Sequence, residues 1–338
     1  MTTAVRTGMF ALVAWFVSRY AIDVWDSTHQ YDLEFDSVSL ILAGVLYIAP
    51  WLASVWGWER LLKAFGHNVP IVPVMRSYYC GHPGKYVPGK AAAILIRVAL
   101  LKKYGVSAIS ASVTSVAETG LLMLQGLALS VLLIGVAVPS ESLPAQYQLV
   151  RDVSPLTLLI ITLLLSPVLL SFACLAANRV TERLLRATAA RHSQGETSSA
   201  HRQVAELEVE SFQPFTISFM TGSVAAFLAT WFMQGQSLAM LIRSIGIEVS
   251  LFNSLIVCTT AVAAGTSIGF FAFLAPGGLA IREGIIIAIV TPLTGGSAAV
   301  IVAISLRALW FVSEIVVSAL LFFIPADYHT VSDSASVA

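Results

Sequence analysis

Gly81-His-Pro-Gly-Lys-Tyr-Val-Pro-Gly-Lys90 interrupts an apolar part of the chain, and a similar phrase, Gly269-Phe-Phe-Ala-Phe-Leu-Ala-Pro-Gly-Gly278, does so near the other end. In both copies a glycine is followed seven positions later by Pro-Gly, and the two prolines lie 276 − 88 = 188 residues apart. Paired glycine and proline interruptions in the two halves of a membrane protein point to broken helices around a binding site at membrane depth. The sequence therefore predicts two pseudo-repeats, with helix breaks at Gly81, Pro88, Gly89, Gly269, Pro276, Gly277 and Gly278.

The composition is that of an integral membrane protein. Of the 338 residues, 57% are hydrophobic and 11% are charged, whereas soluble domains carry about 25% charged residues. A helix needs about 20 mainly apolar residues to cross the hydrocarbon core. The segments that satisfy or approach this length are 8–22, 38–58, 107–138, 155–178, 215–242, 249–273 and 297–324. The predicted fold class is an all-α polytopic helical bundle of about 7–8 spans.

Two further apolar stretches, 88–101 and 279–293, adjoin the Pro-Gly pairs and are too short to cross comfortably. We predict that they are re-entrant segments or half-helices. The hydrophilic stretch 179–213 is interpreted as a cytoplasmic linker between repeat halves at about 38–178 and 214–326. Together these segments predict a single membrane domain over residues 1–326 and a frayed tail at 327–338.

Loop charges predict the orientation in the membrane. The loop after the first predicted helix is acidic and lacks Lys and Arg, since its charged residues are Asp23, Asp26, Asp32, Glu34 and Asp36. The next loop carries Arg60, Lys63 and Arg76, and the linker 179–213 is rich in arginine. Because basic loops stay in the cytoplasm, a cytoplasmic N-terminus is predicted. No small-residue cleavage site follows the first helix, so we expect it to be retained.

The motifs of soluble enzymes do not fit this chain. Gly84-Lys-Tyr-Val-Pro-Gly-Lys90 matches the start of a phosphate-binding P-loop, but Ala91 replaces the magnesium-binding hydroxyl and no strand precedes it. The cysteines are isolated, the histidines show no zinc spacing, and no nucleophile motif occurs. We therefore predict no catalytic residue, no metal site, no cofactor and no nucleic-acid partner.

Three ionisable residues lie inside predicted spans, namely Glu118, Arg307 and Glu314. Charges at membrane depth are rare, usually face the bundle interior and mark functional sites. Glu118 lies 118 − 88 = 30 positions after Pro88, and Arg307 lies 307 − 276 = 31 positions after Pro276. This near-equivalence predicts a Glu118–Arg307 ion pair at the repeat interface. A pair that only holds the two halves together stays open as an alternative.

Basic residues gather at both breaks, with Lys85, Lys90 and Arg97 at the first and Arg282 at the second. A break followed by a helix start offers free backbone N–H groups to an anion, and arginine adds a forked contact to phosphate. The predicted substrate-binding residues are Lys85, Tyr86, Lys90, Arg97, Glu118, Arg282, Glu283, Arg307 and Glu314. For the lysines, snorkelling to the headgroups is the alternative. For most of Tyr78, Tyr79, Tyr86 and Trp310 we favour the interfacial aromatic belt.

Several of these residues also carry a family resemblance. Arg76-Ser-Tyr-Tyr79, Gly84-Lys-Tyr-Val-Pro-Gly-Lys90, Arg97 and Glu118 resemble, in this order, the first half of the membrane domain of lysylphosphatidylglycerol synthetases. Pro276-Gly-Gly-Leu-Ala-Ile-Arg-Glu-Gly284 is similar to the second motif of that flippase-like family, with Ala280 where a second glycine is common. The resemblance covers nearly the whole chain. It implies a helical bundle with re-entrant elements that moves a charged lipid between leaflets, and it singles out Lys90, Arg97, Glu118, Arg282 and Glu283.

Full-length synthetases carry a soluble aminoacyl-transfer domain after the membrane part, whereas this sequence ends at Ala338. We therefore expect a stand-alone member without lysyl transfer, more a transporter than an enzyme, in a prokaryotic plasma (inner) membrane. Its substrate would be a phosphate-bearing lipid, with Arg97 and Arg282 holding the phosphate. A lipid-modifying enzyme or glycosyltransferase is the expected protein partner. Two other hypotheses stay open: a non-transporting membrane partner in lipid, hopanoid or glycan biosynthesis, and an embedded transferase with Glu118 or Glu283 as base.

Overall fold

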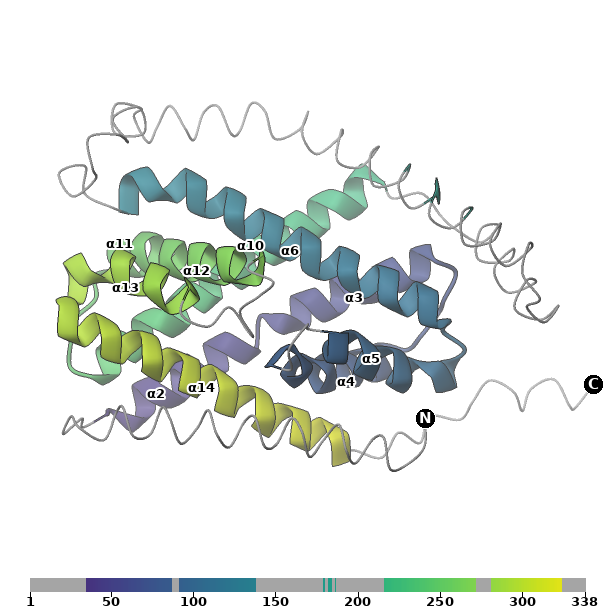
Figure 1. The fold of residues 1–338 in the computed structure, drawn as a ribbon, viewed down its shortest axis with the longest axis horizontal. Helices are drawn as coiled ribbons and strands as arrows, with labels where there is room; N and C mark the ends of the chain where they lie inside the picture. Colours follow the sequence, from purple (N-terminus) through teal and green to yellow (C-terminus); the bar gives the residue numbers. More distant parts are fainter. Residues whose placement is uncertain are drawn as a thin grey trace, which may run out of the picture.

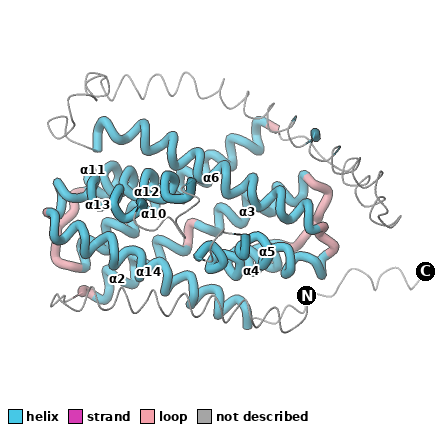
Figure 2. Tube along the Cα trace, in the orientation of Figure 1, coloured by secondary structure: helices cyan, strands magenta, loops and turns pink. Residues whose placement is uncertain are grey.

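The computed structural model describes residues 35–86, 91–137, 216–271 and 281–323, together with 179, 182, 183 and 186. The predicted helices at 8–22 and 155–178, both Pro-Gly pairs, Lys90, the tail and most of the linker lie outside the described residues. The ordered elements in the described ranges are all helical (Figure 2). They are α2 (Ser37–Ile48), α3 (Trp51–Ala64), α4 (Ile71–Gly81), η1 (His82–Tyr86), α5 (Ala91–Leu101), η2 (Lys102–Tyr104), α6 (Ala108–Ala137), α10 (Ile217–Ser244), α11 (Leu251–Asn253), η5 (Ser254–Cys258), α12 (Thr259–Phe271), α13 (Ile281–Thr294) and α14 (Gly296–Phe323).

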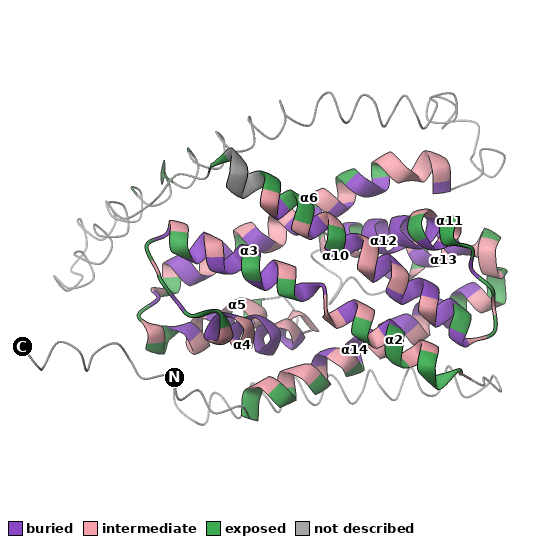
Figure 3. Cartoon of the chain, turned by 180° about the vertical axis from the view of Figure 1, so that it is seen from behind, coloured by how far each residue is buried: buried purple, intermediate pink, exposed green. Residues whose placement is uncertain are grey.

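In the described part of the chain, five helical segments are long and apolar enough to cross a membrane: Ser37–Ala64, Ala108–Ala137, Thr221–Ser244, Leu251–Phe271 and Gly296–Phe323. The outer faces of α6 and α14 carry exposed residues (Figure 3). On α14 these include Val312, Val316 and Leu320, which recur every four residues and so form one apolar stripe. An apolar stripe that faces outward suits contact with lipid. The predicted polytopic helical membrane protein is confirmed.

The two short helices sit where the sequence placed its short apolar stretches. Helix α5 has 11 residues and α13 has 14. At 1.5 Å per residue they are about 16 and 21 Å long, less than the roughly 30 Å of the hydrocarbon core. Neither can therefore cross the membrane alone. Each is followed by a tight glycine turn with positive φ, at Gly105 (77°) and Gly295 (82°), and then by a long helix.

A second pair of turns reveals an internal repeat. Helix α3 ends in a turn at Gly66 with φ 81°, and α10 ends in a turn at Gly246 with φ 82°. The Gly66 N–H donates to the Lys63 carbonyl and the Gly246 N–H to the Arg243 carbonyl, both at 2.9 Å. The offset is 246 − 66 = 180 residues. Among the described residues, each half thus contains a long helix, a second helix, a short helix and a final long helix.

The long helix of one half runs antiparallel to the long helix of the other. In Figure 1, α2–α3 and α10 cross the molecule in opposite directions. Three hydrogen bonds join them along their length: Asp36 N–H to the Ser244 carbonyl (2.8 Å), Ser237 hydroxyl to the Ala43 carbonyl (2.7 Å) and Thr230 hydroxyl to the Pro50 carbonyl (3.2 Å). Helices α4 and α5 lie at one end of the molecule, whereas α11 and α13 lie at the other (Figure 2). The two halves therefore have opposite orientations.

The contact between Pro50 and Thr230 locates the symmetry. The 180-residue offset makes these two residues equivalent, since 230 − 50 = 180, and they touch. Equivalent residues of an inverted repeat meet only at the axis that relates the two halves. A pseudo-two-fold axis therefore passes close to this contact, as in transporters built from inverted repeats.

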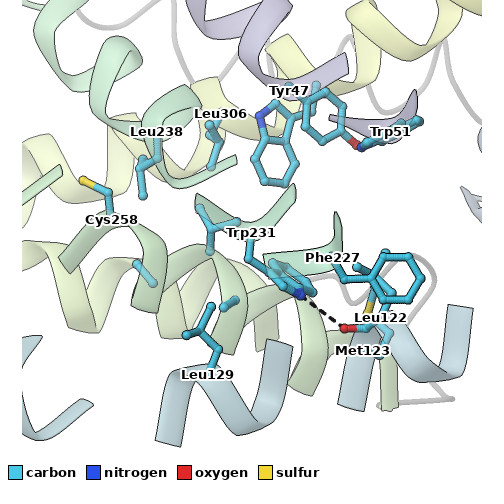
Figure 4. Close-up of a cluster of buried hydrophobic side chains, with 14 of the residues drawn as sticks. Tyr47, Trp51, Leu122, Met123, Leu129, Phe227, Trp231, Leu238, Cys258 and Leu306 are labelled. Carbon is cyan, nitrogen blue, oxygen red and sulfur yellow. Dashed lines mark hydrogen bonds between the residues drawn. The ribbon is translucent and has the colours of Figure 1, made fainter. Parts of the chain in front are cut away.

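The core around this axis is aromatic and tightly packed (Figure 4). Tyr47 and Trp51 of α2–α3 correspond by the same offset to Phe227 and Trp231 of α10, and all four side chains are buried. The Trp231 indole N–H donates to the Leu122 carbonyl of α6 (3.2 Å), which satisfies its polar atom in the apolar interior.

Candidate functional site

Two glycines of the first sequence phrase, one in α4 and one in η1, allow these two elements to pack against α5. A Cβ added at Gly81 would lie 2.7 Å from the Cγ of Arg97, and one added at Gly84 would lie 2.5 Å from the backbone nitrogen of Ala93. These separations are shorter than carbon contacts in proteins allow. Gly81, predicted as a helix-break residue, is thus the last residue of α4 and the point where α4 meets Arg97.

Arg97 and Glu118 form the first buried ion pair. The Arg97 Nη1 lies 3.5 Å from the Glu118 Oε2, and the Glu118 side chain is fully buried. Tyr78 and Thr119 each donate a hydroxyl hydrogen bond to the same carboxylate, both at 3.0 Å. The guanidinium also stacks over the Tyr78 ring, 4.1 Å from its centroid, and lies 5.0 Å from that of Trp58. Both partners are therefore held on several sides.

The predicted Glu118–Arg307 pair is wrong, because each residue pairs with another. Glu118 of α6 binds Arg97 of α5, and Arg307 of α14 binds Glu283 of α13. In both cases the pair joins a short helix to the long helix that follows it through a glycine turn. Helices linked by a short turn are antiparallel neighbours, so their side chains meet.

Lys85, Tyr47 and Glu314 form a second cluster, in which Tyr47 and Glu314 are buried and the Lys85 side chain is 28% exposed. The Lys85 ammonium lies 2.5 Å from Glu314 Oε1, and the Tyr47 hydroxyl donates to the same oxygen. Lys85 also lies over the rings of Trp51 (5.4 Å) and Tyr86 (5.2 Å). Lys85 therefore faces an aromatic and acidic interior rather than snorkelling to the headgroups.

Arg282 carries a buried charge without an ionic partner in the described part of the chain. It is the second residue of α13 and is only 7% exposed. Its guanidinium lies 4.2 Å above the centroid of Trp310, which itself stacks on Tyr47 at 4.2 Å. Among the described residues, neither its Nε nor its Nη2 has a hydrogen-bond partner. A buried guanidinium whose N–H groups lack hydrogen-bond partners costs folding free energy. The Nε and Nη2 of Arg282 are therefore suited to binding an anion.

These groups form one connected region. Lys85 shares Glu314 with Tyr47, Tyr47 stacks on Trp310, and Trp310 lies under Arg282. The neighbouring residue of Arg282 completes the region, because Glu283 binds Arg307. Arg282 and Arg307 also act electrostatically on Lys85. The region, which we call the interior charge cluster, consists of Lys85, Arg282, Glu283, Arg307 and Glu314. It holds three cations and two carboxylates, a net charge of 3 − 2 = +1.

The aromatic residues differ from the sequence prediction. Tyr78, Tyr79 and Trp310 are 2%, 4% and 1% exposed, so they belong to the interior and the belt interpretation is wrong for them. Tyr86 is half-buried and packs edge-on against Phe311 at 5.0 Å. Sequence reasoning also missed Tyr47 and Trp58. Within the described ranges, no group of three or more His, Cys, Asp or Glu side chains is arranged to hold a metal ion.

Comparison with known families gives a match over nearly the whole chain. The model of the family described as "Lysylphosphatidylglycerol synthase TM region" matches residues 4–318. The match includes both sequence phrases and every residue of the interior charge cluster. Comparisons with curated proteins and with solved structures gave no match.

Proposed function

The chain belongs to the lysylphosphatidylglycerol synthase TM region family, and we propose that it translocates a phosphate-bearing lipid between membrane leaflets. Candidate substrates are a phospholipid or a polyprenyl-phosphate-linked glycan. Membership of this family supports a role in lipid biosynthesis or translocation. The interior charge cluster supports the choice of a phosphate.

Arg282 is the observation that carries the proposal. It supplies the one positive charge in the interior charge cluster that the two carboxylates do not balance. It also lies in the first turn of α13, where unpaired backbone N–H groups favour an anion. A phosphate bound here would satisfy both free guanidinium nitrogens. Arg97, by contrast, is already paired with Glu118, so we assign the phosphate to Arg282 alone.

The inverted repeat supports transport rather than scaffolding. Inverted halves give a protein two related conformations, each open to one side of the membrane, with the binding site near the axis. The interior charge cluster lies next to this axis. Tyr47, which donates a hydrogen bond to Glu314 of the cluster, is three residues before Pro50, the residue at the axis. A lipid headgroup bound there would be exposed to either side in turn.

We place the end of the molecule where α3 meets α6 in the cytoplasm. Trp58 near the end of α3 donates to Thr114 near the start of α6 (3.0 Å), so these helix ends lie together. This end carries Lys63, Lys102 and Lys103, all exposed. Because basic loops stay on the cytoplasmic side, and the sequence predicts one span at 8–22 before α2, we propose a cytoplasmic N-terminus in a prokaryotic plasma membrane.

Reconstituted vesicles test the proposal. The protein is placed in vesicles of phosphatidylethanolamine and phosphatidylglycerol that contain tail-labelled fluorescent phosphatidylglycerol, and dithionite then bleaches the label in the outer leaflet. We expect the native protein to bring inner-leaflet label to the outside. Arg282→Ala should slow this at least about tenfold, because a hydrogen bond to a charged group contributes about 1.5–3 kcal/mol.

Arg60→Ala is the matched control. Arg60 is also an arginine stacked on a tryptophan, 4.8 Å from the centroid of Trp56, but it lies on α3 outside the interior charge cluster. Its substitution should leave the rate unchanged. A folded Arg282→Ala protein that translocates lipid as fast as the native protein would overturn the proposal.

A further inference from the structure

Each of the two carboxylates of the interior charge cluster has one oxygen that no described residue binds. Glu314 Oε1 accepts from Tyr47 and Lys85, and Glu283 Oε1 accepts from Arg307. The second oxygen of each, Oε2, is buried and has no hydrogen-bond partner among the described residues. The Glu314 side chain is fully buried, and that of Glu283 is 15% exposed. Both Oε2 atoms are therefore acceptors that the described part of the chain does not use.

Glu118 shows that side chains alone can satisfy a carboxylate in this interior. Its Oε1 accepts from Tyr78, whereas its Oε2 accepts from Thr119 and lies 3.5 Å from Arg97. A buried acceptor without a donor costs free energy. The two unused oxygens of the interior charge cluster are therefore positions at which a ligand can donate hydrogen bonds.

Arg282 lies between these two carboxylates. Arg307, Trp310 and Glu314 are spaced three and four residues apart on α14, so they share one face of the helix. The Arg282 guanidinium lies over Trp310, the middle residue of this row. Arg307 holds Glu283 at one end of the row, and Glu314 forms the other end. Seven residues of helix span about 10 Å, so a single headgroup on Arg282 can reach toward both carboxylates.

The charge of the cluster decides which donor suits the unused oxygens. Three cations already face two carboxylates, and each carboxylate has a cation on its other oxygen. An ammonium group would add a further positive charge near Lys85 and Arg307, and like charges repel more strongly where water is scarce. A hydroxyl group donates without adding charge, and its hydrogen bond to a carboxylate is about twice as strong as one between neutral groups. Hydroxyl groups are therefore the donors that suit this site.

We propose that the ligand of this site is a phosphate ester of an uncharged polyol, either glycerol or a sugar. Its phosphate binds Arg282, and its hydroxyl groups donate to Oε2 of Glu283 and of Glu314. The negative charge of a phosphodiester balances the one cation of the cluster that no carboxylate balances. This inference deepens the proposed function, and it rests on the assignment of the phosphate to Arg282.

Competition between lipids of equal charge tests the role of the hydroxyl groups. Phosphatidylglycerol and phosphatidylethanol are both phosphodiesters with one negative charge, but only phosphatidylglycerol has hydroxyl groups on its headgroup. Equal amounts of the two lipids, with matched acyl chains, are added at a low lipid-to-protein ratio to the purified protein in detergent. Native mass spectrometry then measures which lipid is bound. We expect about a tenfold excess of phosphatidylglycerol, the gain in affinity from one hydrogen bond to a charged group.

Two further lipids define the chemistry of the headgroup. Phosphatidylethanolamine has an ammonium group in place of the hydroxyl groups and should also be bound less than phosphatidylglycerol. Phosphatidylinositol carries a ring of hydroxyl groups, so its competition with phosphatidylglycerol shows whether a ring polyol or glycerol fits better. An excess of either polyol lipid over phosphatidylethanol supports the proposal.

Substitutions of the carboxylates assign the preference to this site. Glu314→Gln and Glu283→Gln replace a charged acceptor by a neutral amide of similar size, so each should bring the excess of the polyol lipid closer to one. Glu59→Gln is the matched control. Glu59 is a mostly buried carboxylate that binds a lysine, Lys63, but it lies on α3 outside the interior charge cluster. Its substitution should leave the excess unchanged.

Three outcomes would overturn the proposal: equal binding of phosphatidylethanol and both polyol lipids, a preference for phosphatidylethanolamine, or an excess that survives in both Gln variants of the cluster. The lipid comparison uses the native protein, so it stands even where a Gln variant fails to fold. A polyol preference without lipid movement in vesicles would uphold this site and reject translocation. Lipid movement without a polyol preference would uphold translocation and reject this site.

Discussion

Gly126 provides the sharpest test of the packing that relates the two halves. In Gly126→Ala the new methyl group would lie 2.3 Å from Cζ2 and 2.6 Å from Cε2 of Trp231. The ring cannot easily retreat, because its N–H is bonded to the Leu122 carbonyl at 3.2 Å and the side chain is only 1% exposed. The methyl group must therefore push α6 away from α10 and α12.

Gly120→Ala, six residues earlier on the same helix, separates the two effects of the substitution. A Cβ at Gly120 would meet nothing within 4 Å. Both variants gain the stability of about 0.5–1 kcal/mol that alanine gives over glycine within a helix. The difference between them is then the cost of overpacking, about 1–3 kcal/mol, with the upper part of the range expected because the contact is a held ring.

Thermal unfolding of the purified protein in detergent measures this difference. A loss of 1 kcal/mol lowers the midpoint by about 2–4 °C in chains of 150–250 residues, so Gly126→Ala should unfold several degrees below Gly120→Ala. Equal midpoints for the two variants, or a higher one for Gly126→Ala, would refute the close approach of α6 to Trp231.

Two further predictions concern charged groups. Glu118→Leu or Arg97→Leu alone should destabilise the protein by about 3–5 kcal/mol, because each leaves a buried charge unpaired. The double variant should lose clearly less stability than the sum of the two single losses. Additive losses in thermal unfolding would contradict the ion pair. Asp36 caps α2 by accepting the Ser39 N–H at 3.0 Å, and its hydrogen bonds with Ser39 hold the pKa of this exposed carboxyl below its ordinary value. The cap therefore stabilises α2 above the unfolded pKa and is lost as the pH falls through the lowered pKa. Amide exchange at Val38 and Ser39, divided by the intrinsic exchange rate at each pH, should therefore show less protection in acid. Asp36→Asn should abolish this dependence, and an unchanged acid response in that variant would rule the cap out.

The sequence predicted features that are decided locally. The span expected at 107–138 is α6, Ala108–Ala137, and the span expected at 297–324 is α14, Gly296–Phe323. Their length and apolar composition leave no other stable structure in a membrane. The short helices α5 and α13 were also foreseen, because proline and glycine interrupt the apolar run before each. Every one of these features depends on residues close together in the chain.

The ion pairs were not foreseen correctly, for a physical reason. Glu118 and Arg307 were paired because they hold nearly equivalent positions in the two repeats. In an inverted repeat, however, equivalent residues approach one another only at the axis, as Pro50 and Thr230 do. The relative orientation of the two halves depends on how many times the chain crosses the membrane between them. The spacing of equivalent residues along the sequence does not reveal this number. The short turn after α5 was the available signal, because it makes Arg97 a neighbour of α6.

The repeat also explains why the interior charge cluster is informative. Helices α6 and α14 hold equivalent places in the two halves, and α6 meets α10 and α12 at Gly126 by close packing alone. Burying the Glu314 carboxylate beside Lys85 instead requires desolvating a charge, which packing would have avoided. The anion that Arg282 is proposed to bind accounts for this cost, since Lys85 and Glu314 lie in the same cluster as this unbalanced cation.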